Sequence, residues 1–586
     1  MLIPVLFISM ILLPWIGAVV VWFTGDAHER LQHNLAVTFS VLSAAAAVIL
    51  VPLSQGWGAH PVLSIPTNAT FGNFSFMVDG LGMFLAAVAT VVGSLAVIFS
   101  VDYMKGEAQL GRYYAFVLFF IGAMVGLVTT ANVLLIFVFW EITALCSYAL
   151  ISFHSDDPKA VAGGIKALII TQIGGIGLLV GALLFYSNLH TLDINEIIAQ
   201  AGSLPVNVHA IIAFAFLIAA AAKSAQFPFQ TWLPDAMEAP TPISALIHAA
   251  TMVNAGVYLL VRFYPAFAFV PGWRLAVMIV GMLSALMAAV MALVANDLKR
   301  VLAYSTVSQL GFMVYAVGAG GIFASQFHLM SHSVFKALLF LGAGAVIHSV
   351  GTRDMRLMGG LRKKMPLVST VFIIGALALA GLPILNGFWS KELVLEAGLQ
   401  GGPAWIFAIM LVVVGLTALY TFRCVWLVFF GEPRSELHAH DAGTAMRVAL
   451  IPLAFGSLTT WLLAGPFIAW LAQTVPSQSI EIKTGVEIFG EILTAPATWG
   501  AIVMVLLGLA AWWWRDRLTG LAQSLRQVGK AATDSFGFEA INRSVVTVTQ
   551  GSAEALRATQ TGMLNWNIFG IVAGLVIILV ILALGA

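Results

Sequence analysis

Three titratable side chains stand at regular spacing inside an apolar stretch of the chain. His328, His332 and Lys336 follow one another at intervals of four residues, so an α-helix places all three on one face. Groups about 6 Å apart on such a face can pass a proton from one to the next. Two alternatives stay open, namely histidines that simply bond to neighbouring helices and a metal ion held by the two imidazoles. We favour a proton relay and expect no metal, because no cysteine lies nearby and the nearest acids have other apparent roles.

Three more charged side chains interrupt apolar segments. Glu141 lies near the middle of one segment, and Lys223 and Lys391 each lie beside an expected helix break. A charge at this depth in a membrane costs at least about 2.5–3.5 kcal/mol, so its presence is by default a functional hypothesis. The alternatives are a carboxyl group kept neutral in the core for Glu141, a fixed ion pair for Lys223 and snorkelling to the boundary for Lys391.

The two expected breaks have the same origin. Pro228 follows Lys223 by five residues, and Pro383 precedes Lys391 by eight. Proline removes a backbone hydrogen bond and ends or kinks a helix. Two interrupted helices, each with an embedded lysine, are typical of the internal repeats of transporters. His248 extends the strip of polar groups between them.

Composition places these residues in a membrane. Of 586 residues, 60% are hydrophobic and 9% are charged, whereas soluble proteins carry about 25% charged residues. The net charge of +1 argues against a nucleic-acid partner. The two cysteines, Cys146 and Cys424, form no C-x-x-C motif, and the chain has no phosphate-binding loop and no H-E-x-x-H. We therefore expect no cofactor and no metal in this chain.

A membrane helix needs about 20 mainly apolar residues. The sequence predicts sixteen such spans, at 2–23, 33–53, 79–101, 113–130, 132–152, 160–186, 207–225, 240–262, 270–294, 300–319, 326–350, 367–382 continuing as 386–399, 404–430, 446–472, 492–514 and 562–584. Loops after odd-numbered spans carry nineteen Lys and Arg residues, and loops after even-numbered spans carry three, Arg262, Arg274 and Lys483. The positive-inside rule then predicts a multi-pass protein of the cell (inner) membrane with both termini on the outer, periplasmic side.

At these residues the chain resembles the antiporter-like subunits shared by respiratory complex I, membrane-bound hydrogenases and Mrp sodium/proton antiporters. The matching strings are Val78-Asp-Gly-Leu81, Phe139-Trp-Glu141 to Cys146-Ser-Tyr148, Lys223-Ser-Ala-Gln-Phe-Pro228 through Trp232-Leu-Pro-Asp-Ala-Met237, Ala239-Pro-Thr-Pro to His248, Asn296-Asp-Leu-Lys-Arg300, Ala303 to Gly311, His328 to Lys336 and Asn386-Gly-Phe-Trp-Ser-Lys391. They cover roughly residues 75–400.

The resemblance implies an all-α polytopic fold of about 16 transmembrane helices with two inverted five-helix repeats, in which helices 7 and 12 are broken. The implied divisions are 1–112 (helices 1–3), 113–262 and 263–430 (the repeats), 431–514 (helices 14–15), 515–561 (a lateral amphipathic segment) and 562–586 (an anchor helix). In such subunits Glu141 and Lys223 would form the charge pair of the first half-channel. His248 with His328, His332 and Lys336 would form the central relay, and Lys391 the exit.

The C-terminal part is similar to that of subunit L (chain 5) of NADH:quinone oxidoreductase. A polar stretch runs from Arg515 to about Thr561 and would extend about 70 Å as one helix, although Phe536-Gly-Phe538 is expected to interrupt it. Two positions depart from subunit L, which usually has Arg and Asp in the sixth span where this chain has Gln172 and Gly175.

The resemblance implies a proton-translocating subunit of a complex I-type NADH:quinone oxidoreductase or a related redox-driven complex, with no redox chemistry in this chain. Its partners would be other membrane subunits, including further antiporter-like ones, together with protons, possibly Na⁺, and the lipid bilayer. Two alternatives are the large subunit of a Mrp-type Na⁺/H⁺ antiporter and a membrane coupling subunit for inorganic-carbon uptake. A purely structural anchor is disfavoured by the buried charges.

Overall fold

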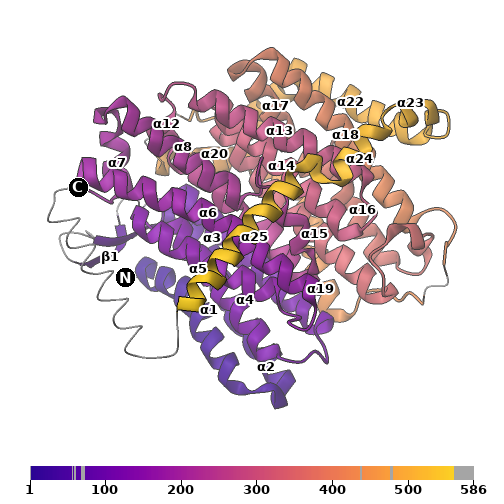
Figure 1. Ribbon diagram of the computed structural model, residues 1–586, viewed down its shortest axis with the longest axis horizontal. Helices are drawn as coiled ribbons and strands as arrows, with labels where there is room; N and C mark the ends of the chain where they lie inside the picture. The colour runs from indigo at the N-terminus through magenta and orange to yellow at the C-terminus, as the bar shows by residue number, and fades with distance from the viewer. Residues whose placement is uncertain are drawn as a thin grey trace. The chain divides into compact units, whose positions relative to one another are not determined.

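Figure 1 shows a computed structural model of the protein, in which helices follow one another along almost the whole chain. The structure describes residues 2–55, 57, 61–67, 73–435, 438–475 and 480–559. Residues Met1–Phe536 form one compact unit, and the residues from Gly537 onward form a second. The expected anchor helix at 562–584 lies outside the described residues.

Fourteen helical stretches of the described residues are long and apolar enough to cross a membrane. They are α1 (Leu2–Thr24), Asp26–Ser54 with α2 (Glu29–Ser54), α3 (Gly80–Tyr103), α4 (Leu110–Thr129), α5 (Val133–Ile151), α6 (Pro158–Leu189), α8 (Val206–Lys223), Thr241–Arg262 with α10 (Thr241–Ala245) and α11 (Met252–Arg262), α13 (Trp273–Val294), α14 (Leu298–Ala319), α15 (Ile322–Val350), α18 (Ala404–Phe429), Thr444–Thr474 with α19 (Thr444–Thr459) and α20 (Ala464–Thr474), and α22 (Pro496–Trp513). A further segment is divided into α16 (Pro366–Ala380) and α17 (Asn386–Gly401). These match the first fifteen predicted spans in order, so the polytopic all-α class is confirmed.

Shorter elements connect the spans. They are α7 (Ile194–Gln200), α9 (Trp232–Asp235), α12 (Tyr264–Phe267), α21 (Gly485–Thr494) and a hairpin of β1 (Pro61–Pro66) and β2 (Asn73–Met77). The hairpin was not predicted, because the search for spans tests only long apolar segments. Phe76 also forms an antiparallel bridge with Thr130, just beyond α4. The hairpin therefore lies at the end of the bundle where α3 begins and α4 finishes.

Both predicted helix breaks are present. After α8, Ala225 has φ of 51°, and after α16, Gly381 and Ile384 have φ of 82° and 81°. A side chain other than glycine rarely adopts this left-handed backbone, so each break is imposed by its surroundings. The indole of Trp232 donates to the carbonyl of Ala222 at 3.0 Å. A carbonyl at the end of α8 is thus satisfied inside the protein, as the absence of water in a membrane core requires.

Small residues allow α6 to pack closely against α8. A Cβ added at Gly174 would lie 2.7 Å from the Cβ of Ala222, and one added at Gly177 would lie 2.8 Å from the carbonyl oxygen of Ala215. Such separations leave no room for a side chain. The glycine cluster therefore mediates close helix contact, which is common between membrane helices.

Beyond α22 the polar arm is divided into short helices. They are α23 (Thr519–Ser524), α24 (Arg526–Thr533) and α25 (Phe538–Thr559). Phe536 and Gly537 have φ of 54° and 83°, so the predicted interruption at this point is confirmed. The longest of the three, α25, has 22 residues and spans about 33 Å at 1.5 Å per residue.

A buried ion pair joins the start of α3 to the end of α11. Arg262 donates through both terminal nitrogens to the Asp79 carboxylate, with Nη2–Oδ1 at 2.9 Å, and through Nε to the Tyr258 hydroxyl at 3.1 Å. Asp79 also accepts from the backbone N–H of Gly82 and so caps α3. The sequence analysis counted Arg262 among the loop cations, whereas the structure places it at the last residue of α11. Its side chain is 5% exposed, because a carboxylate 183 residues away in sequence folds onto it.

We expect Arg262→Gln to destabilise the protein by about 3–5 kcal/mol, because the substitution leaves the Asp79 carboxylate buried without its partner. Thermal unfolding of the detergent-solubilised chain, followed by circular dichroism, measures the effect as a lower apparent Tm. Arg30→Gln serves as the control, since Arg30 is exposed. An unchanged Tm in Arg262→Gln would contradict a stabilising role for the pair.

Candidate proton pathway

Lys223 lies at the last residue of α8 and is completely buried. Its Nζ donates to the backbone carbonyl of Trp140 at 2.7 Å and lies 4.8 Å from the centre of the Trp140 ring. Trp140 directly precedes Glu141 on α5, so the amine and the carboxylate lie close together. The expected neighbourhood of Glu141 and Lys223 is present in the fold, although the lysine bonds to the backbone and not to the carboxylate.

The Glu141 carboxylate instead contacts α6. Gln172 donates to its Oε2, and a Cβ added at Gly175 would collide with its Oε1. These are the two positions at which the chain departs from subunit L. Here a neutral amide bonds to the carboxylate, and a residue without a side chain leaves space beside it. The sequence showed that both positions were unusual but not that both face Glu141.

His248 lies in a π-helical turn, Leu246–Ala250, between α10 and α11. A π-turn leaves backbone carbonyls without their usual partners, and two side chains compensate. Thr251 Oγ1 donates to the carbonyl of Leu246 at 2.6 Å, and Asn254 Nδ2 donates to that of Ala249 at 2.9 Å. The His248 ring lies 5.4 Å from the ring of Phe340 on α15, and neither of its nitrogens has a hydrogen-bond partner among the described residues.

The predicted row of His328, His332 and Lys336 lies along α15 and is fully buried. Phe340 lies one turn beyond Lys336 on α15. Because His248 packs against Phe340, it lies past the Lys336 end of the row. Lys336 Nζ donates to Ser305 Oγ and to the carbonyl of Leu302 on α14. The two nitrogens of His332 lack partners within the described part of the chain.

His328 joins the row to two other helices. Its Nδ1 lies 2.9 Å from Ser390 Oγ on α17, and its Nε2 lies 3.1 Å from Gln309 Oε1 on α14. Because an amide oxygen only accepts, the second bond requires a proton on Nε2. Ser390 directly precedes Lys391, so the far end of the row reaches the second broken helix. Sequence reasoning missed Gln309 and Ser390 as partners of His328, although both lie inside the matching strings.

Lys391 is buried at the second break. Its Nζ donates to the carbonyl of Leu379, near the end of α16, at 2.7 Å and lies 5.9 Å from the centre of the Phe312 ring. Snorkelling to the boundary is therefore wrong for this residue. Glu392 beside it is 2% exposed, and its Oε2 has no partner among the residues that the structure describes.

A fourth lysine is also buried with its amine bonded to a backbone carbonyl. Lys299, which the sequence count placed in a basic loop, is 3% exposed, and its Nζ donates to the carbonyl of Ala239 at 2.6 Å. Its neighbour Asp297 caps α14 by accepting from the backbone N–H of Arg300. Sequence reasoning missed the burial of the Lys299 amine beside this cap.

Ion pairs gather at the same end of the bundle. Asp235 accepts from Lys166 at 2.7 Å and from Arg300 at 3.2 Å, and Arg353 contacts Glu238 at 3.0 Å and Asp297 at 3.1 Å. Partial burial alone would lower the pKa of Arg353, but its hydrogen bond to Glu238 and the nearby Asp297 carboxylate raise the pKa above its ordinary value. These carboxylates are partly exposed, so the network lies near the surface at this end of the bundle.

No group of three or more His, Cys, Asp or Glu side chains within the described residues is arranged to hold a metal ion. Both cysteines are buried and unpaired.

Comparison with known proteins agrees with this arrangement. Residues 130–417 match the family described as NADH:quinone oxidoreductase/Mrp antiporter, TM, and residues 65–114 match that of NADH-ubiquinone oxidoreductase (complex I), chain 5 N-terminus. Over 98% of both chains, the sequence is 34% identical to NADH-quinone oxidoreductase subunit L of Escherichia coli K12. The chain belongs to the NADH:quinone oxidoreductase/Mrp antiporter family.

Both branches of the NADH:quinone oxidoreductase/Mrp antiporter family are represented among the relatives. Na⁺/H⁺ antiporter subunit A1 of Staphylococcus haemolyticus is 36% identical over 75% of this chain and 58% of its own length. A chain of the Mrp complex from Dietzia sp. DQ12-45-1b superimposes with a TM-score of 0.82 at 27% identity, over 99% of this chain and 63% of its own. The family and the complex I-like resemblance expected from the sequence are confirmed.

We expect Gly175→Ala to lower proton translocation about tenfold to a hundredfold, because the new Cβ displaces the Glu141 carboxylate and small misplacements of reacting groups have effects of this size. Proton uptake by proteoliposomes that contain the assembled complex measures the loss. Gly177→Ala is the matched control, since its Cβ would press on α8 without approaching Glu141. Equal losses in the two variants would mean that helix packing, and not the carboxylate, causes the defect.

Proposed function

We propose that this chain is a proton-translocating, antiporter-like subunit of a complex I-type NADH:quinone oxidoreductase or a related redox-driven membrane complex. The observation that carries the proposal is the strip of titratable groups that runs from the half-buried Glu141 through the buried Lys223, His248 and α15 row to Lys391. The full-length similarity to a bacterial NADH-quinone oxidoreductase subunit L supports the redox-driven setting.

The first step of the mechanism is a change in the charge of Lys223. A carbonyl oxygen accepts a hydrogen bond from an ammonium or from a neutral amine, so the Trp140 carbonyl holds Lys223 in both states. The charge of the nearby Glu141 carboxylate favours the ammonium. Any event that withdraws this charge, by protonation or by a shift toward Gln172, favours release of the lysine proton.

The central relay then carries the proton to the second half. His248 and His332 have unsatisfied nitrogens, so each can accept or donate through a water molecule or after a ring rotation. His328 is bonded on both sides and reaches Ser390, next to Lys391. The relay thus ends at a lysine that is held, like Lys223, by a backbone carbonyl.

An outward route continues along α17. Glu392, Glu396 and Gln400 recur every four residues and share one face. Glu396 Oε1 accepts from Gln400 Nε2 at 2.7 Å, its Oε2 is buried without a partner among the described residues, and Gln400 is exposed. We assign release to this row, with Lys391 and Glu392 at its inner end.

The orientation and partners follow from the same proposal. The basic loops, including the Asp235 and Arg353 networks, would face the cytoplasm, and both termini would lie on the periplasmic side of the inner membrane. Residues 113–262 and 263–430 would form the two inverted repeats, since each contains one broken helix. Redox cofactors would belong to partner subunits, and the neighbours in the membrane would include further antiporter-like subunits.

A Mrp-type Na⁺/H⁺ antiporter subunit is the second candidate, favoured by the relatives from Staphylococcus haemolyticus and Dietzia. Mass spectrometry of the complex that co-purifies with the chain in mild detergent separates the two. Flavin and iron–sulfur subunits support the redox-driven complex. Small membrane subunits alone, with sodium-dependent transport, would replace it with the antiporter, and a single zinc protein as partner would point to inorganic-carbon uptake.

We expect Lys223→Ala to lower proton translocation about a hundredfold or more, the scale of losing a positioned acid–base group. The measurement is pH-dye quenching in energised proteoliposomes, with electron transfer or sodium exchange recorded in parallel. Lys483→Ala is the control, because Lys483 pairs with Glu491 on the surface, outside the strip. Unchanged translocation in Lys223→Ala would favour a purely structural anchor.

We expect Glu396→Gln to slow translocation less than Glu392→Gln, because Glu396 lies nearer to solvent and water can partly replace it. Both variants should keep the thermal stability of the parent chain, since a glutamine preserves size and shape. Glu481→Gln, at an exposed site, is the control for loss of one negative charge. Equal rates in Glu396→Gln and the parent would remove this row from the exit route.

A further inference from the structure

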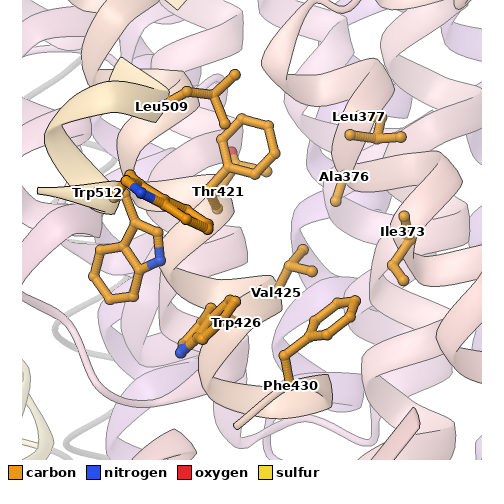
Figure 2. Close-up of a pocket in the computed structure, with 11 residues that line it drawn as sticks. Ile373, Ala376, Leu377, Thr421, Val425, Trp426, Phe430, Leu509 and Trp512 are labelled. Atoms are coloured by element: carbon orange, nitrogen blue, oxygen red, sulfur yellow. The ribbon is translucent and has the colours of Figure 1, made fainter. Parts of the chain in front are cut away.

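A cavity of about 300 Å³ lies between α16, α18 and α22. Figure 2 shows Trp426 and Phe430 at one end of it and Leu377 and Leu509 toward the other. Trp512 and Trp513 of α22 complete an aromatic wall. Thr421 supplies a hydroxyl without a partner among the described residues, and the rest of the lining is apolar.

Two arginines border the aromatic end of this cavity. The guanidinium carbon of Arg515 lies 4.8 Å from the centre of the Trp512 ring and 5.9 Å from that of Trp426. The guanidinium carbon of Arg362 lies 5.4 Å from the centre of the Phe430 ring. The rings of Trp426 and Phe430 are stacked 5.9 Å apart, so the two cations flank one continuous row of aromatic rings.

Within the part of the chain that the structure describes, neither cation is neutralised by a close ion pair. The nearest carboxylate recorded for Arg515 is that of Asp516 at 3.9 Å, with both side chains open to solvent. Arg362 is exposed and belongs to the basic run Arg362-Lys363-Lys364. Cation–π contacts fix the direction of a guanidinium. Arg515 Nη1 donates to the Trp512 carbonyl at 3.2 Å, and the other N–H groups of the guanidinium remain to bind a ligand. The arrangement presents two sets of oriented donors beside an apolar cavity.

We propose that this cavity is a binding site for an anionic phospholipid. One acyl chain would occupy the space between α16, α18 and α22, and the phosphate would lie between Arg515 and Arg362. An apolar cavity alone gives a lipid tail little preference, because the surrounding bilayer is equally apolar. The arginines therefore decide the selectivity, since guanidinium groups bind phosphate oxygens in bidentate pairs.

Charge complementarity favours a lipid over a helix of a partner subunit. A helix seated in the cavity would press apolar side chains against two guanidinium groups and leave their donors unpaired, which is costly. A phosphate pairs with both. Basic pockets between helices at the positively charged boundary of a membrane protein are known to recognise anionic head groups in this way. The inference does not depend on the transported ion.

The test uses the purified full-length chain in mild detergent with two photoactivatable lipids, phosphatidylglycerol and phosphatidylcholine, which carry the same diazirine acyl chain. Peptide mapping locates the cross-links. We expect phosphatidylglycerol to label the α18 and α22 peptides that contain Trp426 and Trp512 several-fold more than phosphatidylcholine does. The double variant Arg362→Gln/Arg515→Gln should reduce this labelling to the level of phosphatidylcholine.

Two further variants separate the possible results. Leu377→Trp, which fills the cavity, should block labelling by either lipid, and Arg30→Gln, which removes a distant exposed charge, should change nothing. Equal labelling by both lipids, or labelling that survives loss of both arginines, would overturn the proposal. In the native complex, a partner helix cross-linked at these peptides in place of lipid would overturn it as well.

Discussion

A lysine amine buried in the membrane against a backbone carbonyl is the interaction on which the rest of the bundle depends. Lys223, Lys336 and Lys391 each donate to a carbonyl, and among the described residues none of them forms a carboxylate ion pair within 4 Å. A buried charge that lacks a counter-ion is costly, so each site must accommodate both the charged and the neutral amine. A carbonyl oxygen can accept a hydrogen bond from either form of the amine, whereas a bound carboxylate would keep the amine charged.

One of these three carbonyls lies at a helix interruption, whereas those of Trp140 and Leu302 lie inside α5 and α14. The Leu379 carbonyl that holds Lys391 lies at the end of α16, directly before a break with left-handed backbone. The π-turn around His248 leaves carbonyls that Thr251 and Asn254 satisfy. Asp79 and Arg262 show the opposite solution, because a bidentate buried pair ties two helices together and has no reason to change charge. In the proposed mechanism this pair would keep its charges, whereas the buried lysines would change theirs.

Much of this could be predicted from the sequence, because it rests on local periodicity. The spans follow from runs of apolar residues, the two breaks from Pro228 and Pro383, and the His328 row from four-residue spacing. What could not be predicted depends on contacts between distant residues. Nothing local shows that Gln172 donates to Glu141, that Arg262 meets Asp79, or that Ser390 and Gln309 flank His328. The hairpin of β1 and β2 was missed because its strands are shorter than the segments that a search for spans can detect.

The interruption at Phe536 has a mechanical consequence. A rod transmits a push along its axis only if it is continuous, because a hinge converts compression into bending. The backbone of the polar arm leaves the helical conformation at Phe536, and α23 and α24 before it have only 6 and 8 residues. An arm divided in this way would transmit little force along its length.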